Sequence, residues 1–553
     1  MWIKYEARIL LKSNILSSFA KGAFAGAIAL GFLFVLRLGG IAPFPPESAL
    51  EAFLKIVPAK VQETSVQQLG TFAGRLGLIV TTIISVAVYG ALGILFEKWY
   101  TPRMSTRTFS RLEKYLIFSL IPFLFFGLVV LISGYSVFGI SSSFSQSSSL
   151  WLFPIALLIG NAIYGIALGW QYGAAVVFSK TKQSQTASRE SVASSRRSFI
   201  ERGALALGAL VLLATGINGL LTSQSSGTLN PITLKGTPIN TANEPTIFED
   251  PRLGNLVNSE VTSNSEFYQV DIDIFAPSVD ASTWTLQVGG LVQNPKTYTL
   301  PQLQSLTKTV EYNTFECVSN NVNGNLISNA EWEGLRLSDL FSDVGGISSG
   351  AEYVVFYSVD GYSVGIPVAK AMMQDSILAY TMNSSSLPQN HGFPLRAVIP
   401  GLYGMMSAKW IRKIQVVNTS YVGYWQSRGW SNNGTVQTLA FITAPSNGLT
   451  QSLSANNGTV MVGGYAYSGD RGISKVEVST DGGKTWQEAV LKPPVSNNTW
   501  TLWAFEWTTM ETGSVNVYAR ATDGTGAVQT STYTGNFPSG ATGYVAIAVN
   551  VTK

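Results

Sequence analysis

The only cysteine of the 553-residue chain lies in the stretch Phe315-Glu316-Cys317-Val318-Ser319-Asn320. The only histidine begins a second stretch, His391-Gly392-Phe393-Pro394-Leu395-Arg396. One residue of each kind cannot build a disulfide framework, a multi-cysteine zinc site or an iron–sulfur cluster. A metal site that takes one thiolate from the protein and its other donors from a cofactor fits this inventory. The alternative for each residue taken alone is a small buried cysteine and an ordinary core histidine.

The charge of the chain changes sign near residue 221. Residues 1–221 have a net charge of +11, and residues 222–553 have a net charge of −7. A basic first part and a mildly acidic second part argue against nucleic acid as a partner, because no basic patch accompanies the second part.

The first part contains uncharged apolar runs long enough to cross a bilayer. Because several runs follow one another, membrane spans are favoured over the alternative of buried core helices. The sequence predicts about five transmembrane helices, at residues 19–38, 76–96, 115–132, 150–172 and 203–221.

Lysine and arginine in the connections predict the orientation of these helices. Five occur in residues 97–114, six in residues 173–202 and none in residues 133–149. The excess of positive charge places the first two loops in the cytoplasm, so five crossings of the cytoplasmic membrane put residues 222–553 on the extracytoplasmic side. Arg196-Arg197 before the fifth run is similar to a twin-arginine export signal, and the alternative is a basic membrane flank.

Residues 222–265 are polar and rich in proline, which predicts a linker. Alternating apolar residues predict strands at 284–288 and 353–357, and short helices are expected at 300–306 and 337–341. Strands and helices mix without a regular βαβ repeat, so residues 266–422 are predicted to form an α+β domain.

Residues 423–553 read as an all-β domain. Period-two patterns predict strands at 460–467, 473–479, 500–507 and 515–521, separated by turn residues. Several short strands in about 130 residues are typical of an immunoglobulin-like β-sandwich.

From about Thr262 to the C-terminus, the chain resembles the sulfite oxidase family of molybdenum enzymes in its membrane-anchored prokaryotic form. The resemblance rests on motifs in family order rather than on composition. These motifs are Thr262-Ser263-Asn264-Ser265-Glu266-Phe267-Tyr268, Trp284-Thr285-Leu286-Gln287-Val288-Gly289-Gly290 with Pro295, Cys317, Trp332-Glu333-Gly334, His391 to Gly401, Ser407-Ala408-Lys409-Trp410 and the hairpins of 463–486.

The resemblance implies a molybdenum–molybdopterin cofactor with Cys317 as the protein ligand of the metal. A soft thiolate suits such a centre, and Arg396 offers a planar fork for the cofactor phosphate. The resemblance also implies a C-terminal domain of the dimerisation type, and thus a possible homodimer. The expected cofactor-binding residues are Asn264, Tyr268, Cys317, His391, Arg396, Ser407 and Lys409.

One departure from the family concerns the substrate. Sulfite-oxidising members place an arginine a few residues after the metal-binding cysteine, whereas no cation follows Cys317 here until Arg336. The substrate is therefore left open between a sulfite-like anion and a sulfoxide or N-oxide. Arg428 and Tyr362 are further candidates for the catalytic site, together with Cys317.

The histidine and cysteine content also indicates how the enzyme exchanges electrons. The predicted membrane spans contain no histidine, and the chain has no Cys-x-x-Cys-His motif, so no haem is expected. The sequence thus predicts a membrane-anchored oxidoreductase that exchanges electrons with a separate carrier, namely a cytochrome, another soluble carrier or a quinone. The alternative is a membrane-tethered binding module whose oxidoreductase domain has lost its cofactor.

Overall fold

The computed structural model describes residues 2–38, 44–57, 72–104, 155–168, 236–237, 244–258, 260–272 and 276–553. The chain packs into two units. The first comprises residues 1–57 and 72–226, and the second comprises residues 58–71 and 227–553.

The described part of the first unit is helical. Two of its helices contain segments, Ile15–Arg37 and Leu76–Leu95, that are long and apolar enough to cross a membrane by length and composition alone. A buried core helix or a signal sequence would meet the same criterion. The described helices are α1 (Trp2–Leu38), α2 (Pro45–Ile56), α4 (Phe72–Met104) and the helix Ile155–Leu168.

These helices overlap with three of the five predicted membrane spans. The two long apolar segments coincide with the predicted spans 19–38 and 76–96, and Ile155–Leu168 covers the middle of the predicted span 150–172. The predicted spans 115–132 and 203–221 lie outside the described residues. A bundle of about five transmembrane helices therefore stays a prediction.

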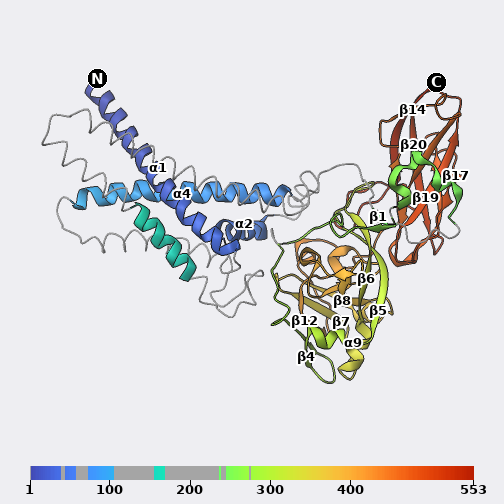
Figure 1. Cartoon of the computed structure of the whole chain (residues 1–553), viewed down its shortest axis with the longest axis horizontal. Coiled ribbons are helices and arrows are strands. Elements are labelled where there is room, and N and C mark those ends of the chain that lie inside the picture. The colour runs from blue at the N-terminus through green and yellow to red at the C-terminus, as the bar shows by residue number, and fades with distance from the viewer. Residues whose placement is uncertain are drawn as a thin grey trace. The chain divides into compact units, whose positions relative to one another are not determined.

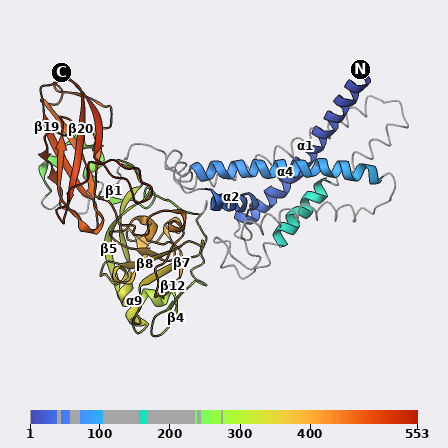
Figure 2. The same cartoon turned by 180° about the vertical axis from the view of Figure 1, so that it is seen from behind.

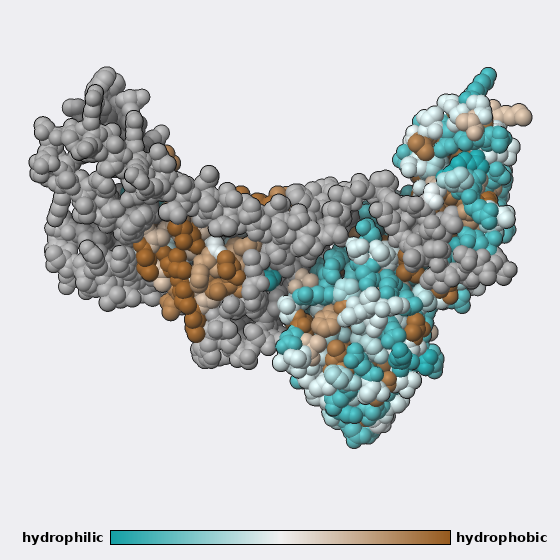
Figure 3. All heavy atoms as spheres, in the orientation of Figure 1, coloured by the Kyte–Doolittle hydropathy of each residue, from teal (hydrophilic) through white to brown (hydrophobic). Residues whose placement is uncertain are grey.

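Helices α1 and α4 cross closely through glycines (Figures 1 and 2). A Cβ atom added to Gly22 would lie 2.9 Å from the Cα of Gly93, so a larger side chain would push the two backbones apart. Small residues at a helix crossing are typical of membrane helices. The helical unit also exposes apolar surface, shown in brown in Figure 3, including Leu16 at 71% and Ile83 at 63% exposure.

The second unit begins with a segment that packs on the C-terminal domain. The short helices η1 (Thr246–Glu249) and η2 (Pro251–Asn258) bury Phe248, Leu253 and Leu256. The last two side chains lie against Gly463, since a Cβ there would be 2.6 Å and 2.8 Å from their Cδ2 atoms. Within the predicted linker 222–265, residues 246–258 form 3₁₀ turns that bury apolar residues without a helical or strand period.

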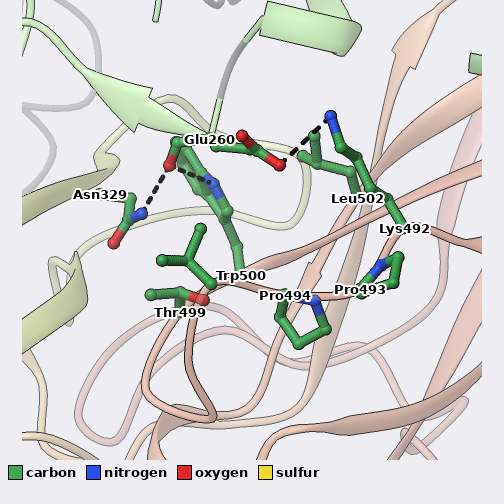
Figure 4. A pocket seen from close by; sticks show the side chains of 9 residues that line it. Glu260, Asn329, Lys492, Pro493, Pro494, Thr499, Trp500 and Leu502 are labelled. Atoms are coloured by element: carbon green, nitrogen blue, oxygen red, sulfur yellow. Dashed lines mark hydrogen bonds and ion pairs between the residues drawn. The ribbon is translucent and has the colours of Figure 1, made fainter. Parts of the chain in front are cut away.

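A buried ion pair fastens this segment. The Lys492 ammonium lies 2.9 Å from Glu244 and 3.2 Å from Glu260, and all three side chains are largely buried. The Glu260 carbonyl accepts hydrogen bonds from Asn329 at 2.5 Å and from Trp500 at 3.2 Å. Figure 4 shows Glu260, Lys492, Asn329 and Trp500 around a small hollow. The segment therefore contacts strands of both domains that follow it.

The α+β domain contains two five-stranded sheets and short helices, which confirms the predicted mixture of elements. The first sheet consists of β10 (Ser385–Ser386), β9 (Ile377–Met382), β6 (Ile327–Arg336) and β5 (Lys308–Glu316), with β11 (Arg396–Val398) on β9. The second consists of β4 (Lys296–Thr299), β3 (Thr285–Gly290), β12 (Ile411–Val417), β7 (Tyr353–Ser358) and β8 (Ser363–Pro367). The helices are α8 (Leu300–Gln304), α9 (Leu337–Asp343) and α10 (Val368–Ala371).

The C-terminal domain is a β-sandwich, as the period-two patterns predicted. Apolar side chains of both sheets, among them Val462, Trp503, Val517 and Val549, form one buried layer between them. One sheet consists of β13 (Leu439–Ala444), β15 (Thr459–Tyr467), β19 (Thr501–Thr508) and β18 (Val490–Leu491). The other consists of β14 (Thr450–Ser452), β21 (Val545–Thr552), β20 (Gly513–Asp523), β16 (Ile473–Ser479) and β17 (Gln487–Glu488).

The core of the α+β domain continues into the sandwich. A single cluster of buried side chains contains Trp284 and Phe356 from the former, and Phe441, Tyr465 and Trp500 from the latter. The ring of Tyr465 lies 4.6 Å from that of Phe441 and 4.8 Å from that of Trp500. The two domains are thus packed together by apolar burial, without a disulfide.

Candidate active site

Cys317 begins the loop that joins β5 to β6. Its amide donates a hydrogen bond to the Leu326 carbonyl at 2.9 Å, which closes the base of the loop. Its sulfur is 3.0 Å from the Ser319 hydroxyl, and the side chain is buried. Burial raises the pKa of the Cys317 thiol, although Ser319 opposes this shift. A thiolate in this position therefore needs a cationic centre beside it.

Glu316 is a buried acid next to the cysteine. Burial raises the pKa of Glu316 to about 8, although the hydrogen bond from the Asn320 amide, at 3.0 Å, lowers it. The carboxyl group is therefore largely protonated at neutral pH and places no full negative charge beside Cys317. Local sequence assigned no role to Glu316.

Arg396 on β11 is a buried cation. Its guanidinium carbon lies 4.6 Å from the ring of Phe315 and 4.7 Å from that of Trp332, and Nη1 donates to the His391 carbonyl at 3.0 Å. Burial lowers the pKa of Arg396 to about 10, so the group stays charged at neutral pH. Within the described residues, no carboxylate forms an ion pair with it. A buried guanidinium that contacts two backbone carbonyls and two aromatic rings, with Asp271 acting on it without a direct ion pair, is suited to an anionic ligand.

Lys409 is less available than the sequence suggested. Its ammonium forms an ion pair with Asp271 and donates to the Asn390 carbonyl at 3.0 Å. Burial lowers the pKa of Lys409, and Asp271 works in the opposite direction. The charge of Lys409, an expected cofactor-binding residue, is therefore partly neutralised by the Asp271 carboxylate. Its role in cofactor binding stays a prediction.

His391 is held as a neutral imidazole. Its Nε2 lies 2.7 Å from the Asn264 carbonyl, which can only accept, so this nitrogen is assigned the proton. Burial lowers the pKa of His391 to about 3. The Asn264 side chain is engaged elsewhere, because its Oδ1 accepts from Asn383 at 2.7 Å. In this structure Asn264 supports the histidine through its backbone.

Tyr268 and Ser407 lie on either side of the short helix η4 (Gly404–Met406). The Tyr268 hydroxyl sits directly over Gly404, where a Cβ atom would collide with it. Burial raises the pKa of Tyr268 well above its usual range, and the charge of Cys317 raises it further. The Ser407 hydroxyl accepts from the Ile399 amide at 3.1 Å and thereby holds the end of β11.

The weaker candidates, Tyr362 and Arg428, are linked through Tyr424. The Tyr362 hydroxyl donates to the Met405 carbonyl at 2.5 Å. Burial raises the pKa of Tyr362, and the charges of Asp360 and Cys317 raise it further. The rings of Tyr362 and Tyr424 are 5.9 Å apart. The Arg428 guanidinium carbon lies 3.5 Å from the Tyr424 ring, and its Nε is buried without a hydrogen-bond partner.

Several residues of the site could not be predicted from the residues next to them in the sequence. Asp271 pairs with Lys409, and Asn383 holds Asn264. Asp360 accepts from the Tyr362 amide at 2.9 Å, and burial raises its pKa to about 7, assisted by Asp271. The Asp360-Gly361 turn before Tyr362 is the one local hint among them.

The donor set fits a molybdenum cofactor. The region around the Cys317 loop combines a buried thiol, a buried cation without a carboxylate partner, a neutral imidazole and serine hydroxyls. The hollow in Figure 4 is lined by other residues, among them Glu260, Lys492 and Trp500, and is distinct from this site.

Comparisons with known proteins agree with this donor set. Residues 274–425 match the family model described as "Oxidoreductase molybdopterin binding domain", and residues 432–549 match "Mo-co oxidoreductase dimerisation domain".

Two curated relatives are sulfite oxidases. The chain is 31% identical to that of Arabidopsis thaliana over 343 residues, which is 52% of this chain and 86% of the plant protein. It is 31% identical to the mitochondrial sulfite oxidase of Rattus norvegicus over 320 residues, covering 50% of this chain and 58% of the rat protein.

A bacterial relative and a solved structure are also similar. The uncharacterized oxidoreductase YuiH of Bacillus subtilis is 32% identical over 155 residues, 28% of this chain and 76% of that protein. The crystal structure of the sulfane dehydrogenase SoxCD from Paracoccus pantotrophus covers 54% of this chain and 81% of that chain, with a TM-score of 0.44 and 22% identity.

Proposed function

The chain belongs to the sulfite oxidase family of molybdopterin oxidoreductases, and we propose that it performs oxo-transfer chemistry on a small substrate at Cys317. In this proposal the enzyme is anchored in the cytoplasmic membrane by its helical part, as in the membrane-anchored prokaryotic type. The catalytic domain faces the extracytoplasmic side and exchanges electrons with a separate carrier.

The observation that carries the proposal is the presence in one domain of a buried thiol, Cys317, and a buried cation, Arg396, with which no carboxylate of the described residues forms an ion pair. Cys317 would supply the thiolate for the metal, and Arg396 would hold the phosphate of the pterin. His391, fixed by Asn264, would present its Nδ1 as an acceptor without adding charge. When bound, the cofactor supplies the oxo transfer and stores two electrons.

The direction of the reaction is open between two balanced forms. Oxidation of sulfite consumes one water and yields sulfate, two protons and two electrons. Reduction of a sulfoxide or N-oxide consumes two electrons and two protons and yields the reduced compound and water. In both directions two protons must enter or leave the site, and Tyr362 and Asp360, joined by the hydrogen bond from the Tyr362 amide to the Asp360 carboxyl group, are the hydroxyl and carboxyl groups assigned to this exchange.

The proposal is tested by the purified full chain in detergent. We expect stoichiometric molybdenum and pterin, together with turnover of sulfite by oxidised dyes or of sulfoxides and N-oxides by reduced dyes. Absence of both molybdenum and pterin from folded protein would favour the alternative, a tethered binding module.

Arg428 separates the two substrate classes. We expect Arg428→Met to raise KM for an anionic substrate about 10- to 100-fold, since a hydrogen bond to a charged group contributes about 1.5–3 kcal/mol. The KM for a neutral sulfoxide should stay unchanged, and Arg428→Lys should recover part of the affinity for the anion. Equal effects of Arg428→Met on both substrates would show that Arg428 does not bind the anion.

The membrane topology is tested independently of the chemistry. Protease added to intact cells or right-side-out vesicles should degrade residues 222–553 and spare the loop 173–202, because the lysines and arginines of that loop favour the cytoplasm. Protection of residues 222–553 with cleavage of the loop would reverse the proposed orientation.

The electron carrier is proposed to be a separate molecule. The chain has one histidine, His391, and one cysteine, Cys317, so it cannot ligate a haem with two histidines in its membrane part. A cytochrome, another soluble carrier or a membrane quinone would serve, and reduction of each by the substrate-loaded enzyme distinguishes them.

The match of residues 432–549 to a dimerisation domain supports a homodimer. A two-fold interface through the sandwich would cover strand edges while leaving both catalytic loops accessible. Mass measurement of the detergent-solubilised chain should give two copies per particle, and a purely monomeric particle at tens of micromolar would contradict this proposal.

A further inference from the structure

The loop that carries Cys317 is held from the C-terminal domain. The side-chain amide of Asn536 donates a hydrogen bond to the Ser319 carbonyl at 2.5 Å and a longer one to Asn321 Oδ1 at 3.3 Å. Asn536 is only 1% exposed, so water does not compete for these contacts. Because a buried amide without partners is costly, its donors fix the conformation of the turn after Cys317.

Two further contacts bind the same loop to the sandwich. The Ile442 amide of β13 donates to Asn323 Oδ1 at 2.9 Å, and Val322 packs against both hydrophobic cores. The loop is also closed on itself, because a Cβ on Gly324 would lie 2.9 Å from the Asn321 amide nitrogen. Because the loop is closed on itself and bonded to the sandwich, the sandwich fixes the position of the first residue of the loop, Cys317.

The contact to Ser319 reaches the sulfur through a single residue. Ser319 carries on its backbone the carbonyl that Asn536 holds, and on its side chain the hydroxyl that lies 3.0 Å from the Cys317 sulfur. A shift of the Ser319 backbone would therefore move the hydroxyl relative to the sulfur. Groups that hydrogen-bond a metal-binding side chain orient it and tune the metal.

We propose that Asn536 is a positioning residue for Cys317, which acts by holding the Ser319 carbonyl and thereby the hydroxyl beside the sulfur. The proposal rests on the proposed function, in which Cys317 ligates the cofactor. It makes the sandwich, more than two hundred residues away in sequence, part of the support of the site.

The test compares Asn536→Leu with a matched control. Leucine keeps the branching and the number of side-chain heavy atoms and removes both N–H donors. The control is Asn498→Leu, because Asn498 is also a buried sandwich asparagine whose amide reaches the α+β domain, at Asp375 Oδ2 (3.0 Å), away from the Cys317 loop. Asn536→Asp, which keeps the shape but loses the donor, serves as the second variant if leucine is not tolerated.

The first readout needs no cofactor. Cys317 is the only thiol of the chain, so its alkylation by iodoacetamide can be followed in full-length protein from a host that makes no molybdopterin. In Asn536→Leu, the alkylation of Cys317 should be about 3- to 10-fold faster, which corresponds to the loss of one hydrogen bond. The Asn498→Leu protein should react at the rate of the unmodified chain.

The second readout uses loaded enzyme. At unchanged molybdenum content, Asn536→Leu should shift the thiolate-to-molybdenum absorption band and lower kcat about 10- to 100-fold, as expected for a group that orients a metal ligand. Ser319→Ala should shift the same band, and the double variant should add little to either single change.

Three results would overturn the proposal: equal behaviour of Asn536→Leu and Asn498→Leu, an unchanged alkylation rate, or strictly additive effects of Asn536→Leu and Ser319→Ala. If the unmodified chain binds no molybdenum, the proposed function fails, while the alkylation rates still decide whether Asn536 positions Cys317.

Discussion

Replacing Cys317 by serine should lower kcat by more than about 100-fold, because loss of a group that merely supports a metal ligand already costs about 10- to 100-fold. A serine hydroxyl is a harder donor with a much higher pKa than a thiol, so it cannot replace the thiolate. Turnover per bound molybdenum, measured on folded full-length protein, is the appropriate quantity.

The matched control is Thr314→Ser, a conservative change on the same strand at a residue that is 1% exposed. Serine keeps the hydroxyl that accepts the Trp500 amide at 3.0 Å, so kcat should stay close to that of the unmodified enzyme. Full turnover by Cys317→Ser with molybdenum still bound would remove Cys317 from the catalytic site.

Replacing Arg396 by alanine should weaken cofactor binding about 10- to 100-fold, since a hydrogen bond to a charged group contributes about 1.5–3 kcal/mol. The substitution also removes the planar group that lies over the neighbouring rings of Phe315 and Trp332. Molybdenum and pterin per folded chain should fall together. Turnover per remaining molybdenum should change little, because Arg396 is assigned to binding rather than to chemistry.

Two control variants accompany Arg396→Ala. Arg396→Lys keeps the charge but loses the planar fork, so its cofactor content should be intermediate. Arg336→Ala removes an exposed arginine of the same domain, whose Nε donates to the Gln374 carbonyl at 3.0 Å, and should keep full content. Unchanged molybdenum in Arg396→Ala would show that the phosphate is held elsewhere.

The fold was predictable where apolar residues recur with a regular period. Alternation indicated the strands around Tyr353 and Val460, and the structure contains β7 and β15 there. The short helices before the α+β domain were not predicted, because their buried residues, Phe248, Leu253 and Leu256, lie in 3₁₀ turns with no long period. Two of the predicted membrane spans lie outside the described residues.

The site was predictable where one local motif carries the chemistry. Cys317 and Arg396 could be proposed from their immediate neighbours. Asp271 could not, because only the folded chain places its carboxylate on Lys409. Asn536 is 217 residues from Ser319, and no local pattern connects them. Long-range partners of this kind decide which predicted cation stays free for a ligand.

The anchoring of the Cys317 loop by Asn536 also has a consequence for biosynthesis. Domains generally fold as they leave the ribosome, N-terminal parts first. Here Asn536, which supports the Cys317 loop, follows that loop by more than two hundred residues, so the loop lacks this support until the sandwich has been synthesised. Insertion of the cofactor is thus expected only after Asn536 has left the ribosome. Ribosome-bound chains stalled before Asn536 has emerged should bind no molybdopterin.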